Sequence, residues 1–264
     1  MKNILKRSTI WVVPLAATLL VSSCDSFLNK LPENSVEKES VDYSNTANMY
    51  MPVSGIYGIV RKKLANWSTY GCLLVRGDDV DKGGAPTDQM ELEYASKFQN
   101  DKLHSFWALN SAWGNCYNVI STANSALESL EKYASFLKTD EDKRLNKQYE
   151  GEVKFFRALS YYQLLSLWKD VPILLDNQQL NIYKSPRREV IKYIYEDLDF
   201  CIGNLPAVHP KDADHAGAVT RYTAMMLKAK VKMQNNEWDD VLSLTNTIIG
   251  DNKFKLYDDF YELF

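Results

Sequence analysis

The stretch FFRALSYYQLL, at residues 155–165, decides the fold of this chain. Apolar side chains cover most faces of a helix drawn through it, and a helix that is apolar nearly all round lies inside a core. We expect this helix to extend over residues 141–169. It should end at Asp170-Val171-Pro172, because proline disfavours helical backbone in the residue before it. The stretch therefore predicts a central helix around which the rest of the domain packs.

Helical periodicity continues on both sides of this central helix. Apolar residues spaced near 3.6 positions apart predict further helices at about 52–65, 104–133, 186–205, 220–234 and 237–249. Ser185 is the expected cap of the third of these, with Pro186 at its first position. Polar turns separate the helices, so neighbours should pair antiparallel. Their mixture of small and aromatic residues resembles tetratricopeptide repeats with an irregular period. The sequence thus predicts an all-α fold of irregular helical hairpins.

Residues 67–99 lack this periodicity. Glycines, Pro86 and an Arg-Gly-Asp-Asp run at 76–79 interrupt every helical pattern. We expect a long irregular loop here, and long loops in compact domains are often functional. The acidic residues do not match a calcium-binding loop, because the twelfth position counted from Asp79 is Met90 and not the required glutamate. We expect a solvated acidic loop, and a looser calcium site is the alternative.

The first 24 residues resemble a bacterial lipoprotein signal. A basic start precedes the apolar run Ile10 to Val21, which is too short to cross a hydrocarbon layer about 30 Å thick. Small residues then lead to Cys24, and such signals are cleaved just before the cysteine, which is acylated. We expect a signal peptide at 1–23, a lipid anchor on Cys24 and a tether at 24–43. The alternative is a buried N-terminal helix with a chance cysteine.

Composition and motifs exclude several classes of function. The 264 residues carry a formal net charge of −3, and loss of the basic leader makes the chain more acidic, which argues against nucleic acid as a partner. Cys116 and Cys201 lie in apolar helical patterns and should be buried, and the chain has no CxxC pair to suggest zinc. Nucleophile elbows, phosphate-binding glycine loops and HExxH are absent from the sequence. We predict no catalytic residue, metal or cofactor.

The ordered set of motifs resembles the SusD/RagB-type nutrient-binding lipoproteins of Bacteroidetes. The similar pieces are Cys24-Asp25-Ser26-Phe27-Leu28 with Pro32, Tyr117–Asn124, Glu152–Ala158 with Tyr161-Tyr162 and Asp170-Val171-Pro172, Tyr195–Leu198 with Leu205-Pro206, and Gly217–Val231 with Trp238. Members of that family are usually about twice this length. We therefore expect residues 44–264 to be the N-terminal helical-repeat half of such a protein, truncated; a short homologue is the alternative.

The resemblance implies a lipid-anchored outer-membrane protein facing the cell exterior. It would bind an oligosaccharide or a peptide and deliver it to a SusC-like TonB-dependent barrel, without enzymatic activity. The half-length chain alone would bind its nutrient weakly or not at all, because a site assembled from both halves loses contacts when one is absent. Two other hypotheses stay open: a structural helical-repeat adaptor or non-functional fragment, and a surface glycan hydrolase.

Aromatic residues are the first candidates for sugar contacts, because flat rings stack on apolar sugar faces. Those in or beside the irregular region are Trp67, Tyr70, Tyr94 and Trp107, and Arg76, Asp78 and Asp79 are the charged candidates. A packing role remains the alternative even for Trp67. Trp113 and Trp168 lie on apolar helical faces and are expected in the core.

Overall fold

The computed structural model describes residues 41–256 and 258–263. The expected signal peptide, Cys24 and most of the tether therefore lie outside the described residues.

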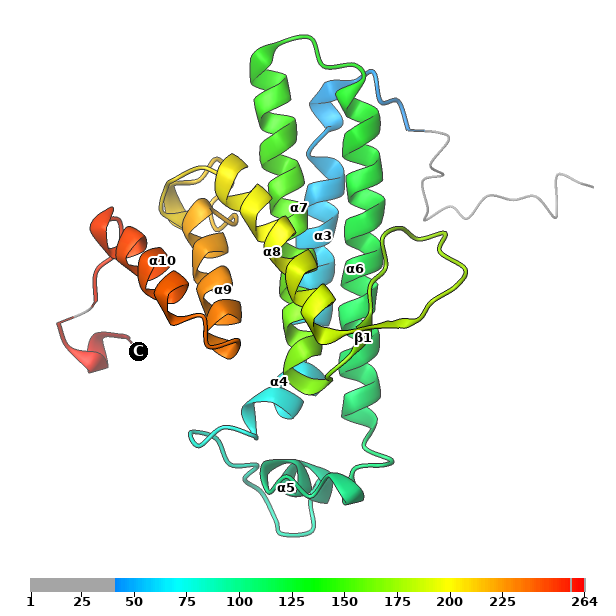
Figure 1. The fold of residues 1–264 in the computed structure, drawn as a ribbon, viewed down its shortest axis with the longest axis vertical. Coiled ribbons are helices and arrows are strands. Elements are labelled where there is room, and N and C mark those ends of the chain that lie inside the picture. Colours follow the sequence, from blue (N-terminus) through cyan, green and yellow to red (C-terminus); the bar gives the residue numbers. More distant parts are fainter. Residues whose placement is uncertain (1–40, 257, 264) are drawn as a thin grey trace, which may run out of the picture. The chain divides into compact units, whose positions relative to one another are not determined.

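A compact unit begins at Tyr43, and its elements follow one another in the order η2 (Thr46–Asn48), α3 (Met51–Lys63), α4 (Trp67–Leu74), α5 (Met90–Ser96), η3 (Asn100–Lys102), α6 (Trp107–Ala134), α7 (Asp140–Leu167), β1 (Val171–Pro172), β2 (Lys184–Ser185), α8 (Arg187–Asn204), η4 (Pro210–Asp212), α9 (Arg221–Gln234), α10 (Trp238–Gly250) and η5 (Phe260–Leu263) (Figure 1). The predicted all-α class is confirmed.

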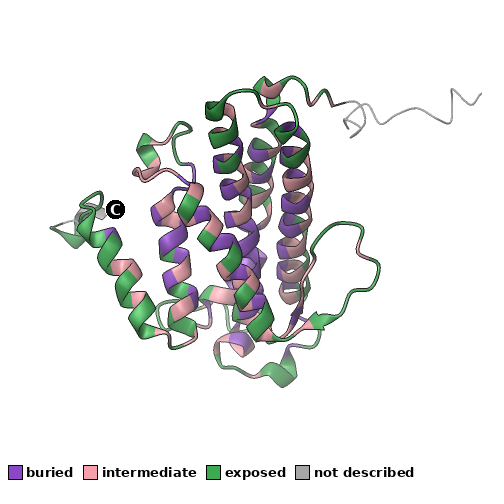
Figure 2. Ribbon diagram, turned by 45° about the horizontal axis from the view of Figure 1, so that its top comes forward, coloured by how far each residue is buried: buried purple, intermediate pink, exposed green. Residues whose placement is uncertain are grey.

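Helix α7 is the centre of the main core, as the sequence predicts. It packs against α3, α6 and α8, and buried residues line the inward faces of these helices (Figure 2). Val153, Ala158 and Leu164 of α7 are completely buried. The helix begins after Thr139, whose Oγ1 accepts a hydrogen bond from the backbone N–H of Asp142 at 3.0 Å and so satisfies one free donor of the first turn.

A buried polar network joins three of these helices. The Arg157 guanidinium of α7 donates two 2.8 Å hydrogen bonds to the Asp197 carboxylate of α8 and one of 2.9 Å to Asn124 of α6. Asn124 in turn donates to the carbonyl of Leu174 at 3.1 Å. The buried Tyr161 hydroxyl accepts from the N–H of Leu174 at 2.8 Å. These contacts fix the segment after α7 against the helices.

The connection from α7 to α8 contains the two short strands. They pair antiparallel, with Val171 opposite Ser185. Ser185 does not cap α8 as expected, because the N-cap position is taken by Pro186. The Asp170 carboxylate instead accepts from the N–H of Arg187 at 3.0 Å, so a residue distant in sequence serves the first turn.

The prediction of an irregular segment over residues 67–99 is wrong for two stretches, α4 and α5. Asn66 caps α4, since its side chain accepts from the N–H of Ser68 at 3.0 Å. A second, smaller core then packs these short helices together; its buried members are Cys72, Val75, Leu92, Ala95, Leu103, Phe106 and Ala108. Helices of eight and seven residues need such packing, because isolated helices of that length are unstable in water.

The three described cysteines are buried and free, which confirms the expectation for Cys116 and Cys201. Burial raises the pKa of Cys72 to about 11 and that of Cys116 to about 12, so these thiols stay protonated near neutral pH. Among the helices of the described residues, none has the length and apolar character needed to cross a bilayer.

Candidate ligand-binding site

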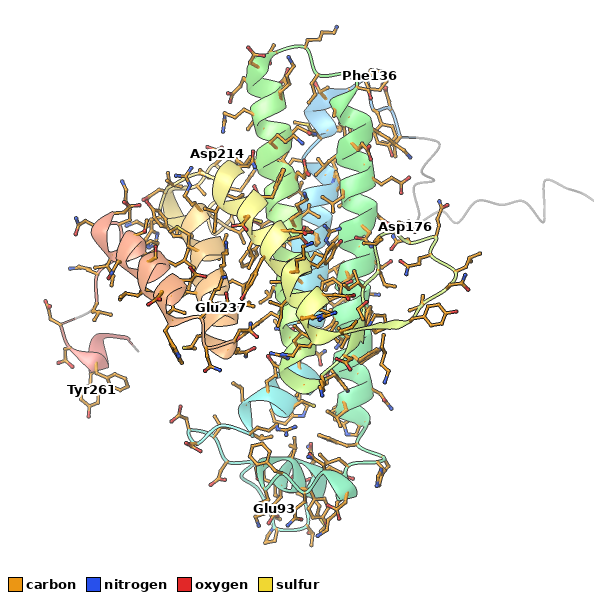
Figure 3. All side chains as sticks on the ribbon, viewed as in Figure 1. Glu93, Phe136, Asp176, Asp214, Glu237 and Tyr261 are labelled. Atoms are coloured by element: carbon orange, nitrogen blue, oxygen red, sulfur yellow. The ribbon has the colours of Figure 1, made fainter. Side chains whose placement is uncertain are left out.

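A groove opens where the small core meets the ends of α6 and α7. It consists of two adjoining hollows of about 260 and 190 Å³, which share Leu103, His104, Leu109 and Trp168. Glu93 marks this end of the unit in Figure 3. The full lining, which we call the Trp168 groove, is Arg76, Asn100, Leu103, His104, Phe106, Leu109, Asn110, Trp113, Leu167 and Trp168. Its two hollows are of a size to hold a small ligand or part of a larger one.

Two tryptophans form the aromatic part of this groove. The rings of Trp113 and Trp168 lie edge to face with their centroids 5.0 Å apart, and Tyr117 packs against Trp113 at 4.9 Å. Tyr117 also donates a 2.7 Å hydrogen bond to the carbonyl of Pro172. Both tryptophans are half-buried against the main core, so the rings are held firmly while part of each borders the groove.

The polar part comes from three exposed side chains, His104, Asn100 and Asn110, and from the half-buried Arg76. His104 and Asn100 lie on the connection between α5 and α6, and Asn110 lies in the first turn of α6. Arg76 follows α4, and its guanidinium stacks over the Phe98 ring at 4.7 Å from the centroid. These groups offer amide, imidazole and guanidinium hydrogen bonds beside flat aromatic surface.

The structure brings one of the predicted ligand residues into this groove, namely Arg76. Trp67 and Trp107 are 55% and 52% exposed and lie at the same end of the unit, outside the groove lining. Tyr94 is half-buried under the Lys102 amine, which lies 4.8 Å from its ring centroid. Asp78 and Asp79 belong to the exposed turn after α4.

Tyr70 lies in α4, and its side chain is outside the described part of the chain.

Sequence reasoning missed His104, Asn100 and Asn110, and it assigned Trp113 and Trp168 to the core alone. Helical periodicity indicates which face of a helix is apolar. It does not indicate whether an aromatic ring on that face is fully buried or also lines a groove. The available signal was the position of Trp168 in the last turn of the predicted helix, because helix ends commonly lie at the surface.

The groove chemistry fits a polyhydroxylated ligand. Aromatic faces can stack on the apolar side of a sugar ring, and the polar groups can hydrogen-bond its hydroxyls. Neither Asp nor Glu is among the described residues that line the groove, whereas glycoside hydrolysis uses a pair of carboxyl groups. Within the described residues, no cluster of three or more His, Cys, Asp or Glu side chains could hold a metal ion.

A larger hollow of about 470 Å³ between α7, α9 and α10 suits sugars less well. Its walls are mostly apolar and include Phe155, Met226 and Phe254. The Tyr222 hydroxyl there already donates to Asp251 at 2.8 Å. Sugar hydroxyls placed in this hollow would lose their hydrogen bonds to water and find few replacements, which costs free energy for each group.

Comparison with known sequences identifies SusD-like relatives of this chain. The sequence model of a family described as SusD-like, starch-binding and associating with the outer membrane matches residues 84–232. A SusD-like protein of Formosa agariphila is 23% identical over 255 residues, which cover 92% of this chain and 46% of the relative. The chain spans about half the length of the curated relatives it matches.

Solved structures share the same fold. A laminarin-binding SusD-like protein superposes with a TM-score of 0.68 at 23% identity, over 82% of this chain and 47% of the other. The surface glycan-binding protein A from Bacteroides fluxus superposes with a TM-score of 0.68 at 25% identity, over 81% of this chain and 46% of the other.

Proposed function

The chain belongs to the SusD-like family, and from this premise we propose that it binds an oligosaccharide in the Trp168 groove for nutrient uptake. Proteins of this family are outer-membrane surface proteins. The observation that carries the proposal is the pair Trp113 and Trp168, held rigidly beside polar side chains, with no carboxylate among the described residues of the lining. The matched relatives whose names state a ligand bind glycans, which favours a sugar over a peptide.

The proposal has a second part, which concerns anchoring and delivery. Cys24 carries lipid and holds the protein on the outer membrane, facing the exterior, and the bound sugar passes to a SusC-like TonB-dependent barrel. The motifs of the first 24 residues and membership of the family support this part. Several acyl chains give stable attachment without a spanning helix.

Calorimetry on the full chain, kept in a non-ionic detergent, tests the ligand class. The probes are starch oligosaccharides, laminarin oligosaccharides and a peptide library. We expect one of the glucans to bind, and Trp168→Ala to weaken its binding at least tenfold, or about 1.4 kcal/mol. Trp238→Ala is the matched control, because Trp238 is 57% exposed on α10 and lies outside the groove.

Two milder variants protect this test against a folding defect. His104→Ala and Asn110→Ala change exposed groove residues and leave both cores intact. Each should weaken glucan binding with an unchanged melting temperature. Binding of peptides but not glucans, or wild-type affinity in all three groove variants, would refute the proposal.

Mass spectrometry tests the anchor separately. The protein from the membrane fraction should begin with an acylated Cys24, and Cys24→Ala should leave it unanchored or unprocessed. An intact Met1 terminus in the membrane fraction would contradict the lipid assignment.

A further inference from the structure

A further hollow, of about 500 Å³, lies at the corner between the first turns of α7, the end of α8 and the start of α9. Its charged lining is Lys143, Arg144 and Lys147 from α7, Arg221 from α9, and a single acid, Asp140. Positions 140, 143, 144 and 147 share one face of α7 at helical spacing, so the cations of α7 point to a common region. We call this hollow the Arg221 pocket.

Arg221 differs from the other three cations. The ion pairs found within residues 41–256 and 258–263 include none to Arg221, and its Nε is buried without a hydrogen-bond partner there. A buried charged donor without a partner is costly, and such a group in a folded protein calls for an explanation. Arg221 lines the pocket, and rotation of its side chain would let the guanidinium, including this Nε, donate to an acceptor bound there.

The two lysines of the pocket are held by weak contacts. Lys143 pairs with Asp140 at 3.2 Å and Lys147 with Glu150 at 2.7 Å, in pairs between neighbours on one helix with largely exposed amines, and such pairs contribute little to stability. Arg144 is held more firmly, because its guanidinium donates two hydrogen bonds to the Glu141 carboxylate, at 2.8 and 2.9 Å. A multivalent acceptor in the pocket could therefore recruit the two lysines.

We propose that the Arg221 pocket binds a compact oxyanion, either a free sulfate or phosphate ion or the acidic group of a charged sugar. Arginine matches such groups because its guanidinium presents two parallel donors to two oxygens. Arg221 is held in place at the start of α9, where its backbone N–H donates to the carbonyl of Pro206 at 3.1 Å. This site is separate from the Trp168 groove and does not depend on the proposed sugar binding there.

Opposing charge limits how strongly the pocket can bind. Asp140 lines it, Glu141 holds Arg144, and Asp214 lies near enough to help raise the pKa of Arg144 after the larger effect of Glu141. Asp214 belongs to the loop between α8 and α9 (Figure 3). Binding of a single free ion should accordingly be of millimolar strength and weaken with added salt.

Thermal unfolding of the full chain in non-ionic detergent measures this binding. Inorganic sulfate and phosphate should raise the melting temperature saturably, beyond the effect of chloride at the same ionic strength. Arg221→Gln should reduce the affinity at least tenfold, and Lys147→Gln should reduce it by a smaller factor. Lys192→Gln is the control, since Lys192 is an exposed cation on α8 that pairs with Glu196 at 3.7 Å and lies outside the pocket.

Acidic oligosaccharides distinguish the two sources of the anion. A sulfated or uronate-containing oligosaccharide that binds at least tenfold more tightly than free sulfate, and loses this advantage in Arg221→Gln, assigns the pocket to a charged sugar. Equal affinity assigns it to the free ion.

His104→Ala should leave anion binding unchanged, so a failure of sugar binding in the groove can be told apart from a failure of anion binding in the pocket. If Arg221→Gln fails to fold, the anion affinities of Lys147→Gln and Arg221→Lys test the proposal instead. The proposal would be overturned if sulfate and phosphate raised the melting temperature no more than chloride does, or if the pocket variants bound the anions with wild-type affinity.

Discussion

Replacement of the buried carboxyl group of Glu152 by glutamine should change how the stability of the domain depends on pH. The Glu152 side chain is fully buried in α7, and the Tyr57 hydroxyl donates to its Oε2 at 2.7 Å. Its Oε1 is buried without a hydrogen-bond partner among the described residues. Burial raises the pKa of Glu152 from 4.5 to about 7. The hydrogen bond from Tyr57 and the nearby amide of Gln148 oppose this rise, and the charge of Asp214 adds to it.

The direction of the effect follows from proton binding. The folded state binds the Glu152 proton more tightly than the unfolded state, so neutral Glu152 contributes stability that is complete below about pH 4.5. This contribution is lost as the pH rises through about 7. Between pH 5 and pH 8 the loss amounts to about 2–3 kcal/mol, because one unit of pKa corresponds to about 1.4 kcal/mol.

Urea unfolding at pH 5, 6, 7 and 8 measures this loss. Glutamine does not titrate, so the stability of Glu152→Gln minus that of the wild type should grow by about 2–3 kcal/mol over this range. Any fixed cost of the amide cancels in the comparison. Glu196→Gln removes an exposed carboxylate of α8 as the control. A difference for Glu152→Gln that stays constant within about 0.5 kcal/mol, the usual size of a surface effect, would refute the reasoning.

Two further predictions concern the interior of the main core. Arg157→Met should destabilise the domain by about 3–5 kcal/mol, because Asp197 is left buried and unpaired, and Arg157→Met combined with Asp197→Leu should recover much of this loss in urea unfolding. An additive loss in the double variant would contradict the pairing. Phe155→Ala should cost about 3–5 kcal/mol, since Phe155 is 6% exposed in the core, while Lys147→Ala on the exposed face of α7 should cost about 0.5 kcal/mol or less. Equal melting temperatures for these two variants would count against the core assignment.

The long helices could be predicted from the sequence because their apolar stripes repeat over many turns. Helix α7 runs from Asp140 to Leu167, close to the expected 141–169, and α6 extends from Trp107 to Ala134 against an expected 104–133. In both, propensity and tertiary burial favour the same backbone state. The proline marks the exit of α7 only approximately, since the helix ends at Leu167 and Trp168 is already extended, two residues before the expected end.

Helix α4 shows where such reasoning stops. It has only eight residues, and its glycine reads as a helix breaker. A Cβ built at Gly71 would lie 3.4 Å from Cδ2 of Leu92, an ordinary van der Waals distance, so α4 lies directly against α5 at this position. That contact joins residues far enough apart in sequence that no local pattern reveals it. The same limit hid the Trp168 groove, whose lining residues are spread along the chain from Arg76, just after α4, to Trp168, just after α7.

Helix α6 connects the two cores and thereby determines the shape of the groove between them. Its first turn contributes Ala108 to the small core, while Cys116 to Tyr133 belong to the main core. Helix α7 makes a similar connection, since Leu167 packs on the small core and Trp168 on the main one. A ligand in the groove would touch both cores, so its binding should stabilise their relative position as well as the side chains it contacts. The groove is thus built at the junction of two packed units, where ligand sites are common.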